Sequence, residues 1–126
     1  MPQHSIAWFE IPVQDLQRAQ AFYEKLIGAP LRRETMGAEE MAVFLPAANK
    51  EGINGCLCLS AERVAPSSQG TRVYLDVSPS IDAALVRASA AGGRVTTPKS
   101  ALPPGMGFFA RIADSEGNVV GLYALA

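Results

Sequence analysis

Four side chains in two apolar segments could bind or transform a small molecule. Trp8 and Glu10 alternate in the segment SIAWFEIPV, and Arg72 and Tyr74 alternate in the segment TRVYLDVS. Alternation is typical of strands, in which residues two apart share a face. A glutamate can act as a general base, an arginine can grip a carboxylate or phosphate, and a tryptophan can stack on a ring. If both strands line one cavity, these residues predict a pocket for a small flat or amphipathic molecule.

The two cysteines, Cys56 and Cys58, are the other candidate reactive groups. Two residues apart on a strand, their Cβ atoms would lie roughly 6–7 Å apart. A disulfide needs about 3.5–4.5 Å between these atoms, so we expect reduced thiols, as in cytoplasmic proteins. Cys58 could act as a nucleophile, but no base is evident beside it, and a small buried hydrophobic role is the alternative.

The elements that position these residues follow one order twice. Residues 5–13 are predicted as a strand, and Asp15 is expected to cap a helix that ends at Gly28. Three strands then follow at 30–35, 40–45 and 55–60, before a polar connector at 62–70. The second half is predicted as a strand at 71–78, a helix at 79–91, strands at 94–97, 107–113 and 118–125, and a proline-rich loop at 98–105.

The second half aligns with the first when it is shifted back by 64 residues. Ile11 then meets Leu75, Val13 meets Val77 and Gly28 meets Gly92. We therefore predict a single α+β domain built from two βαβββ modules, at about 5–61 and 71–126. A helix would cover one face of each module, and the two bare faces would form a curved mixed sheet around a central cavity.

Composition excludes several other classes of protein. The 126 residues are 48% hydrophobic and carry 11 basic against 12 acidic side chains, for a net charge of −1. A nucleic-acid-binding protein needs a basic face, which this balance does not provide. No apolar run approaches the ~20 residues of a membrane span. The first residues lack the pattern of a signal peptide, so we expect a cytoplasmic protein.

Three segments resemble one known family. They are the strand and capped helix WFEIPVQDLQRAQAFYEKLIG, the second helix with its Gly-Gly exit AALVRASAAGGRV, and the terminal hairpin FFARIADSEGNVVGLY. Together they resemble the vicinal oxygen chelate superfamily, which includes glyoxalase I, bleomycin-resistance proteins and extradiol dioxygenases. The resemblance implies the paired βαβββ fold and a homodimer. It does not imply one reaction, because one fold hosts many functions.

Members of this family normally hold a divalent metal with His and Glu side chains from both halves. The resemblance places those positions at Trp8, Cys58, Arg72 and Gly121, of which only Cys58 could ligate a metal. The only histidine, His4, lies four residues before the first position. An arginine in the site would also repel a cation. We therefore predict no metal and no other cofactor.

Three hypotheses of function remain open. The first is a metal-free protein that binds a small organic ligand, anionic or aromatic, with no nucleic-acid or membrane partner. The second is a glyoxalase-like lyase or dioxygenase-type enzyme, with Glu10 as general base and Arg72 stabilising an anion. The third is a structural or interaction module that has lost the pocket, with Trp8 filling it. A separate alternative for Glu10 and Arg72 is that they simply pair with each other. The predicted pocket consists of Trp8, Glu10, Cys58, Arg72, Tyr74 and Gly121.

Overall fold

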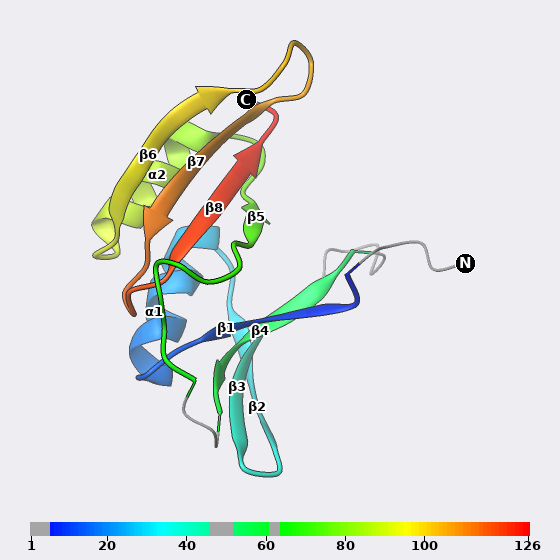
Figure 1. Ribbon diagram of the computed structural model, residues 1–126, viewed down its shortest axis with the longest axis vertical. Helices are drawn as coiled ribbons and strands as arrows, with labels where there is room; N and C mark the ends of the chain where they lie inside the picture. The colour runs from blue at the N-terminus through cyan, green and yellow to red at the C-terminus, as the bar shows by residue number, and fades with distance from the viewer. Residues whose placement is uncertain (1–5, 46–51, 61–63) are drawn as a thin grey trace.

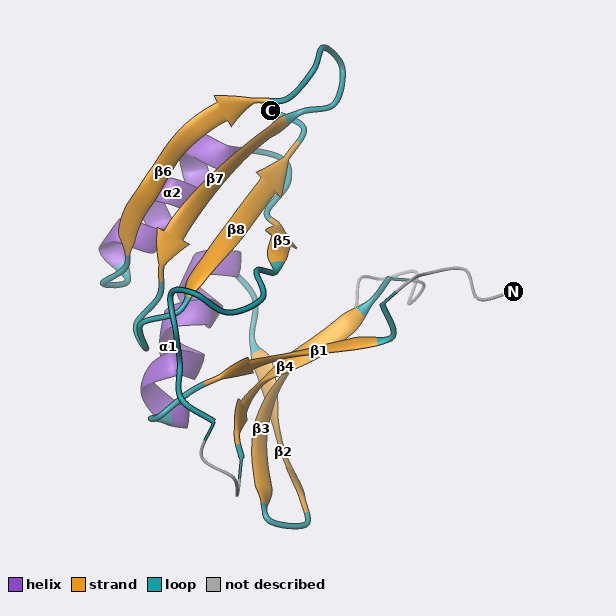
Figure 2. Ribbon diagram, in the orientation of Figure 1, coloured by secondary structure: helices purple, strands orange, loops and turns teal. Residues whose placement is uncertain are grey.

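The computed structural model describes residues 6–45, 52–60 and 64–126, and it contains a strand–helix–three-strand order twice (Figure 2). In chain order the elements are β1 (Trp8–Pro12), α1 (Leu16–Ile27), β2 (Leu31–Met36), β3 (Glu39–Phe44), β4 (Asn54–Leu59), β5 (Tyr74–Asp76), α2 (Ile81–Ala90), β6 (Arg94–Ala101), β7 (Phe108–Ala113) and β8 (Val119–Ala124). The predicted α+β class and its two repeated modules are confirmed.

Each module has its own four-stranded mixed sheet. The strand orders are β1-β4-β3-β2 and β5-β8-β7-β6, with β1–β4 and β5–β8 parallel and the remaining pairs antiparallel. The two sheets are splayed apart and are not closed into a barrel, and both helices lie on the same side of them (Figure 1). In the described ranges, no helix has the length and apolar character needed to cross a bilayer.

Helix α1 has the boundaries that its sequence predicts. The Asp15 side chain accepts a hydrogen bond from the Arg18 backbone N–H at 3.0 Å, which satisfies one of the donors left open at a helix start. At the other end Gly28 has φ +72°, a left-handed conformation that suits glycine. The helix buries Leu16, Ala19, Phe22, Tyr23 and Leu26, which recur at helical spacing.

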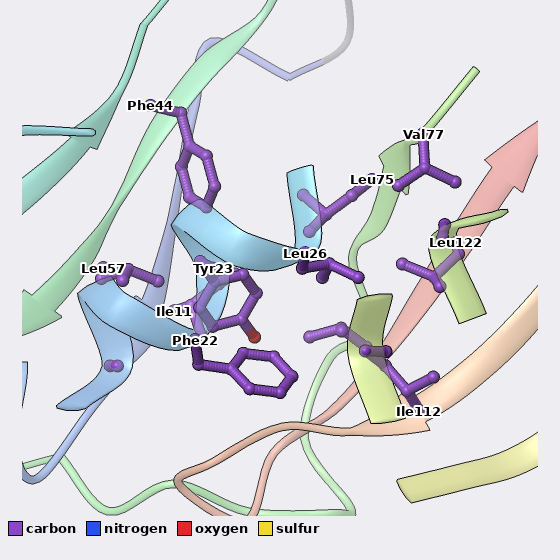
Figure 3. Packing of buried hydrophobic residues seen from close by; sticks show 14 of the residues in the cluster. Ile11, Phe22, Tyr23, Leu26, Phe44, Leu57, Leu75, Val77, Ile112 and Leu122 are labelled. Carbon is purple, nitrogen blue, oxygen red and sulfur yellow. The ribbon is translucent and has the colours of Figure 1, made fainter. Parts of the chain in front are cut away.

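The main hydrophobic core is shared by both modules (Figure 3). Tyr23 and Leu57 of the first module and Ile112 and Leu122 of the second are among its fully buried side chains. Helix α1 packs against α2, so the core continues from one sheet to the other. The sheet faces that contribute to this main core are consequently turned towards the helices.

β5 and β6 are two of the strands whose lengths differ from those predicted. β5 covers only Tyr74–Asp76 of the predicted range 71–78, because it is an edge strand whose pairing with β8 begins at Tyr74. β6 continues through Pro98 to Ala101, beyond its predicted end at residue 97. Proline is tolerated there because β6 is the other edge of the sheet, and the pairing register shifts between Thr97 and Ser100.

The turn between β7 and β8 joins the second module to the first. The Glu116 carboxylate accepts hydrogen bonds from the backbone N–H groups of Gln14 and Asp15, each at 2.9 Å, and from the Arg18 guanidinium at 2.6 and 2.9 Å. These donors lie at the start of α1. A side chain from the second module therefore completes the N-terminal cap of the first module's helix.

Candidate ligand-binding site

Four of the predicted site residues line one hollow between β1 and β5. The hollow has a volume of ≈ 1010 Å³, and Trp8, Glu10, Arg72 and Tyr74 are part of its wall. The two modules thus bring these side chains together from positions more than sixty residues apart in the sequence. Cys58 and Gly121, the other two predicted residues, do not line this hollow.

Trp8 does not fill the larger hollow, and Glu10 does not pair with Arg72, in contrast to two of the alternatives that the sequence left open. The Trp8 side chain is 43% exposed, so it borders the hollow and does not fill it as core. Glu10 and Arg72 are both exposed, and no ion pair joins them among the residues that the structure describes. Arg72 also precedes β5 and does not lie on the strand as predicted, because the pairing with β8 begins two residues later.

A second, smaller hollow lies on the face of the second sheet that points away from α2, here called the open face. Its volume is ≈ 450 Å³. Its wall consists of Tyr74, Asp76, Leu102, Phe109, Arg111 and Tyr123. Tyr74 and Asp76 also line the larger hollow, so the two hollows form one continuous surface.

Gly121 shapes this surface through the side chain that it lacks. A Cβ atom at Gly121 would overlap the ring of Tyr74, its neighbour on β5. The room above the glycine is therefore taken by the tyrosine ring, although Gly121 was predicted to line a ligand pocket. Tyr74 is 44% exposed, so its outer part remains accessible.

Arg111 is held against the aromatic side chains of the open face. Its Nε donates a hydrogen bond to the Tyr74 hydroxyl at 2.8 Å. Its Cζ lies 5.1 Å from the centre of the Phe109 ring and 5.8 Å from that of Tyr74, within the range of cation–π attraction. The sequence analysis did not identify Arg111 or Phe109 as site residues. Arg111 lies between Ala110 and Ile112, which are buried, and this alternation indicates that Arg111 faces away from the core.

The strand register allows the two open faces to be compared residue by residue. Glu10 is paired with Cys56 in the first module, and Tyr74 is paired with Gly121 in the second, so Cys56 is the counterpart of Gly121. The first module's face carries Met41, Val43, Cys56 and Cys58, and the second carries Phe109, Arg111, Gly121 and Tyr123 at the same positions. The first set is a buried apolar cluster. The second set is aromatic and charged, so the two faces have diverged in chemistry.

Neither thiol suits nucleophilic catalysis. Burial, together with the nearby carboxylates Glu10 and Glu39, raises the pKa of Cys56 to about 12 and that of Cys58 to about 11. Both side chains are buried and free of a disulfide. Because the thiolate is the reactive form, these cysteines are protonated and weakly reactive near neutral pH. Cys58 acts as a small buried side chain.

The positions of the family's metal ligands do not fit a divalent metal. Trp8 and Gly121 offer no side-chain ligand atom, and Arg72 places a cation there. Within residues 6–45, 52–60 and 64–126, no three His, Cys, Asp or Glu side chains are grouped so as to hold a metal. His4 lies outside the described residues.

The family of the chain follows from its sequence as well as its fold. A model of the Glyoxalase/Bleomycin resistance protein/Dioxygenase superfamily matches residues 5–122. The chain therefore belongs to this superfamily, as its three motifs had suggested. A search of the curated proteins found no match.

Solved structures share the fold at low sequence identity. A glyoxalase/bleomycin resistance protein from Albidiferax ferrireducens T118 has a TM-score of 0.72 at 19% identity, covering 96% of this chain and 99% of that one. TnmS3, an antibiotic binding protein from Streptomyces sp. CB03234, has a TM-score of 0.65 at 23% identity, covering 100% and 99%. Glyoxalase I from Zea mays has a TM-score of 0.71 at 22% identity, but the match covers 94% of this chain and only 45% of that one.

Proposed function

We propose that this protein binds a small organic molecule, without a metal, on the open face of its second sheet and in the adjoining hollow. The observation that carries the proposal is the divergence of the two modules. Equivalent positions form a buried apolar cluster in one module and an accessible group of aromatic and charged side chains in the other. A purely structural repeat has no need of this difference. The antibiotic-binding activity named for TnmS3, which shares the fold, is in keeping with such a role.

Binding accounts for the described residues better than catalysis does. The two thiols are buried, and their raised pKa values keep them protonated near neutral pH. Three of the four metal-ligand positions, Trp8, Arg72 and Gly121, carry side chains that cannot ligate a metal. The open face instead presents apolar surface, the Arg111 side chain held by its hydrogen bond to Tyr74, and the Asp76 carboxylate. Ligand pockets typically combine such mostly apolar walls with a few fixed polar groups.

The proposal is tested by mapping a ligand screen onto the chain. We expect flat organic compounds to shift the backbone amide NMR signals of residues 74–76, 109–111 and 121–123, and Tyr74→Ala to weaken the binding of each hit. Val86→Ala is a matched control, because Val86 lies exposed on α2 and away from both hollows. A screen whose hits leave those amides unshifted, or bind Tyr74→Ala unchanged, would contradict the proposal.

We also propose that the protein forms a homodimer. Ile6, Trp8, Leu45 and Ile53 all line the larger hollow and are all exposed. Exposed apolar side chains gathered in one place are typical of an interaction surface. Light scattering should give about twice the 13.3 kDa chain mass, and Trp8→Ser should shift the mass towards the monomer. A monomer at micromolar concentration in the unaltered protein would contradict dimerisation.

A further inference from the structure

We infer that the ligand of the open face is a flat ring system that carries an acidic group, and that Arg111 binds this group. The inference rests on the proposed function and deepens it. It assigns the role of anion recognition to a residue that the sequence did not single out, and it moves this role from Arg72 in the larger hollow to Arg111 in the smaller one.

Arg111 has both of its Nη groups left to bind a ligand. An arginine side chain has five N–H donors in a planar fork. Arg111 spends its Nε donor on the Tyr74 hydroxyl, and neither Nη group is bonded to another side chain or carbonyl of the described residues. The Nη groups are the part of the fork that binds a carboxylate or phosphate with two parallel hydrogen bonds. Arg111 is thus oriented by Tyr74 and still able to bind an anion.

The Arg111 side chain is preorganised for binding. The guanidinium is fixed by one hydrogen bond and by the rings of Phe109 and Tyr74. A side chain that is already held in place loses less conformational entropy on binding. Arg72, in contrast, is exposed and has no hydrogen bond or ion pair with the described residues. The structure therefore favours Arg111 as the specific anion-binding group.

The aromatic side chains of the open face can hold the ring system of the ligand. Phe109 and Tyr74 meet edge to face, with ring centres 6.3 Å apart and planes at 72°. The Tyr123 hydroxyl donates to the Met106 carbonyl oxygen at 2.8 Å, so this ring is also fixed, and it lines the smaller hollow together with Leu102. Fixed aromatic side chains bind flat rings by stacking and edge contacts. A volume of ≈ 450 Å³ suits a small fused ring system.

Asp76 sets the orientation of the ligand. Asp76 of β5 is paired with Tyr123 of β8, and Arg111 of β7 is paired with Gly121 of β8. Asp76 and Arg111 are therefore separated by two strands across the sheet and by two residues along it. Strand geometry places their Cα atoms on the order of 12 Å apart. One Asp76 oxygen accepts the Ser78 backbone N–H at 2.9 Å. The acidic group therefore belongs at the Arg111 end, and the Asp76 end suits a hydroxyl or amino donor.

The test uses two probes of the same shape, 2-naphthoate and 2-naphthamide, titrated calorimetrically against the unaltered protein and its variants. We expect the acid to bind about tenfold more tightly than the amide. Arg111→Met should remove this preference while changing the affinity for the amide by less than about twofold. Arg111→Lys should restore only part of it, because an ammonium cannot make the two parallel bonds. Arg32→Met is the control, since Arg32 lies on β2 in the other module.

The outcomes separate this inference from the function on which it rests. If both probes bind equally well at the open face, the inference is wrong but the proposed ligand binding stands. The same holds if Arg72→Met, and not Arg111→Met, removes the preference for the acid. If neither probe binds but neutral flat compounds shift the amides of the open face, the inference is again wrong. If no flat compound binds there at all, the proposed function fails with it.

Discussion

The Tyr23 hydroxyl donates a 2.6 Å hydrogen bond to Oδ2 of Asp114, a residue 91 positions later in the other module. Both groups are buried. The same Asp114 carboxylate accepts hydrogen bonds from the side chain and backbone N–H of Asn118, whose side chain also donates to the Pro12 carbonyl oxygen. This network, together with Glu116, holds α1 and β1 to the β7–β8 turn. The modules are joined by buried polar contacts as well as by a shared core.

Tyr23→Phe should lower the free energy of unfolding by about 1–3 kcal/mol. Burial, with Asp114 beside it, raises the pKa of the Tyr23 phenol well above its usual value, so the hydroxyl stays a donor. Without that donor, the buried Asp114 carboxylate loses a hydrogen bond in a region that water does not reach. Urea unfolding measures the change. Tyr123→Phe is the control, because it removes a hydrogen bond near the surface and should cost less; equal losses in the two variants would contradict the argument.

Stability should fall in acid because of Glu116. Burial alone would raise the pKa of this carboxyl, but hydrogen bonds from Arg18, from the backbone N–H groups of Asp15 and Gln14, and from Ser115 lower it to about 2 from 4.5. The unfolded chain then binds a proton that the folded chain does not, so this contribution to stability is complete above pH 4.5 and is lost as the pH falls towards 2.

Glu116→Gln isolates this effect. Thermal unfolding followed between pH 7 and pH 3 should show a smaller loss of stability in the variant than in the unaltered protein, since glutamine does not titrate. At neutral pH the variant should be less stable by about 1–3 kcal/mol, because it loses hydrogen bonds made to a charged group. Parallel pH profiles for the two proteins would show that Glu116 is not the group responsible.

Alanine at two glycines that each lie beneath an aromatic ring should have unequal effects. A Cβ at Gly55 would overlap the ring of Phe9, which packs against the main core, and a Cβ at Gly121 would overlap the ring of Tyr74, which is 44% exposed. We expect Gly55→Ala to cost about 1–3 kcal/mol, because displacing the Phe9 ring disturbs its packing against the main core and Phe44. Gly121→Ala should cost less, since Tyr74 can swing outwards, but it should displace Tyr74 from Arg111 and weaken ligand binding. Unfolding and titration on both variants test the contrast, and a larger stability loss at Gly121 would contradict it.

The cysteines should be slow to react in the folded protein. With the pKa of Cys58 raised to about 11 and that of Cys56 to about 12, very little thiolate exists at pH 7.5. A chromogenic disulfide reagent should label neither thiol until a denaturant is added, after which both should react. Rapid labelling of Cys58 in the native protein, abolished by Cys58→Ala, would instead indicate an accessible reactive thiol.

The sequence predicted the parts of this fold that depend on local chemistry. Asp15 and Gly28 mark the ends of α1 because caps have strong residue preferences, and alternation placed Ile11 and Val13 in the core. Pairing across strands was harder to predict. The sequence analysis placed the first module's counterpart of Gly121 at Cys58, whereas the registers of β4 and β8 place it at Cys56.

The candidate site shows the same limit. Trp8, Glu10, Arg72 and Tyr74 were expected together, and they line one hollow. Arg111 was missed because its importance comes from contacts with Tyr74 and Phe109, which depend on three strands lying side by side. The role of Glu116 was missed because a turn sequence does not indicate which helix start the turn will meet.

The last prediction is that the protein binds no divalent metal in a one-to-one site. Metal ions of this class need several nitrogen, oxygen or thiolate ligands converging on one point. The positions that relatives use carry Trp8, Arg72 and Gly121, and a thiol whose pKa is raised to about 11 has to give up its proton before it can ligate. Calorimetry with Zn²⁺, Ni²⁺ and Mn²⁺ should therefore show no stoichiometric binding, and a chelator should leave the thermal midpoint unchanged. One metal per chain, lost in Cys58→Ala or in His4→Ala, would overturn this prediction and with it the metal-free part of the proposed function.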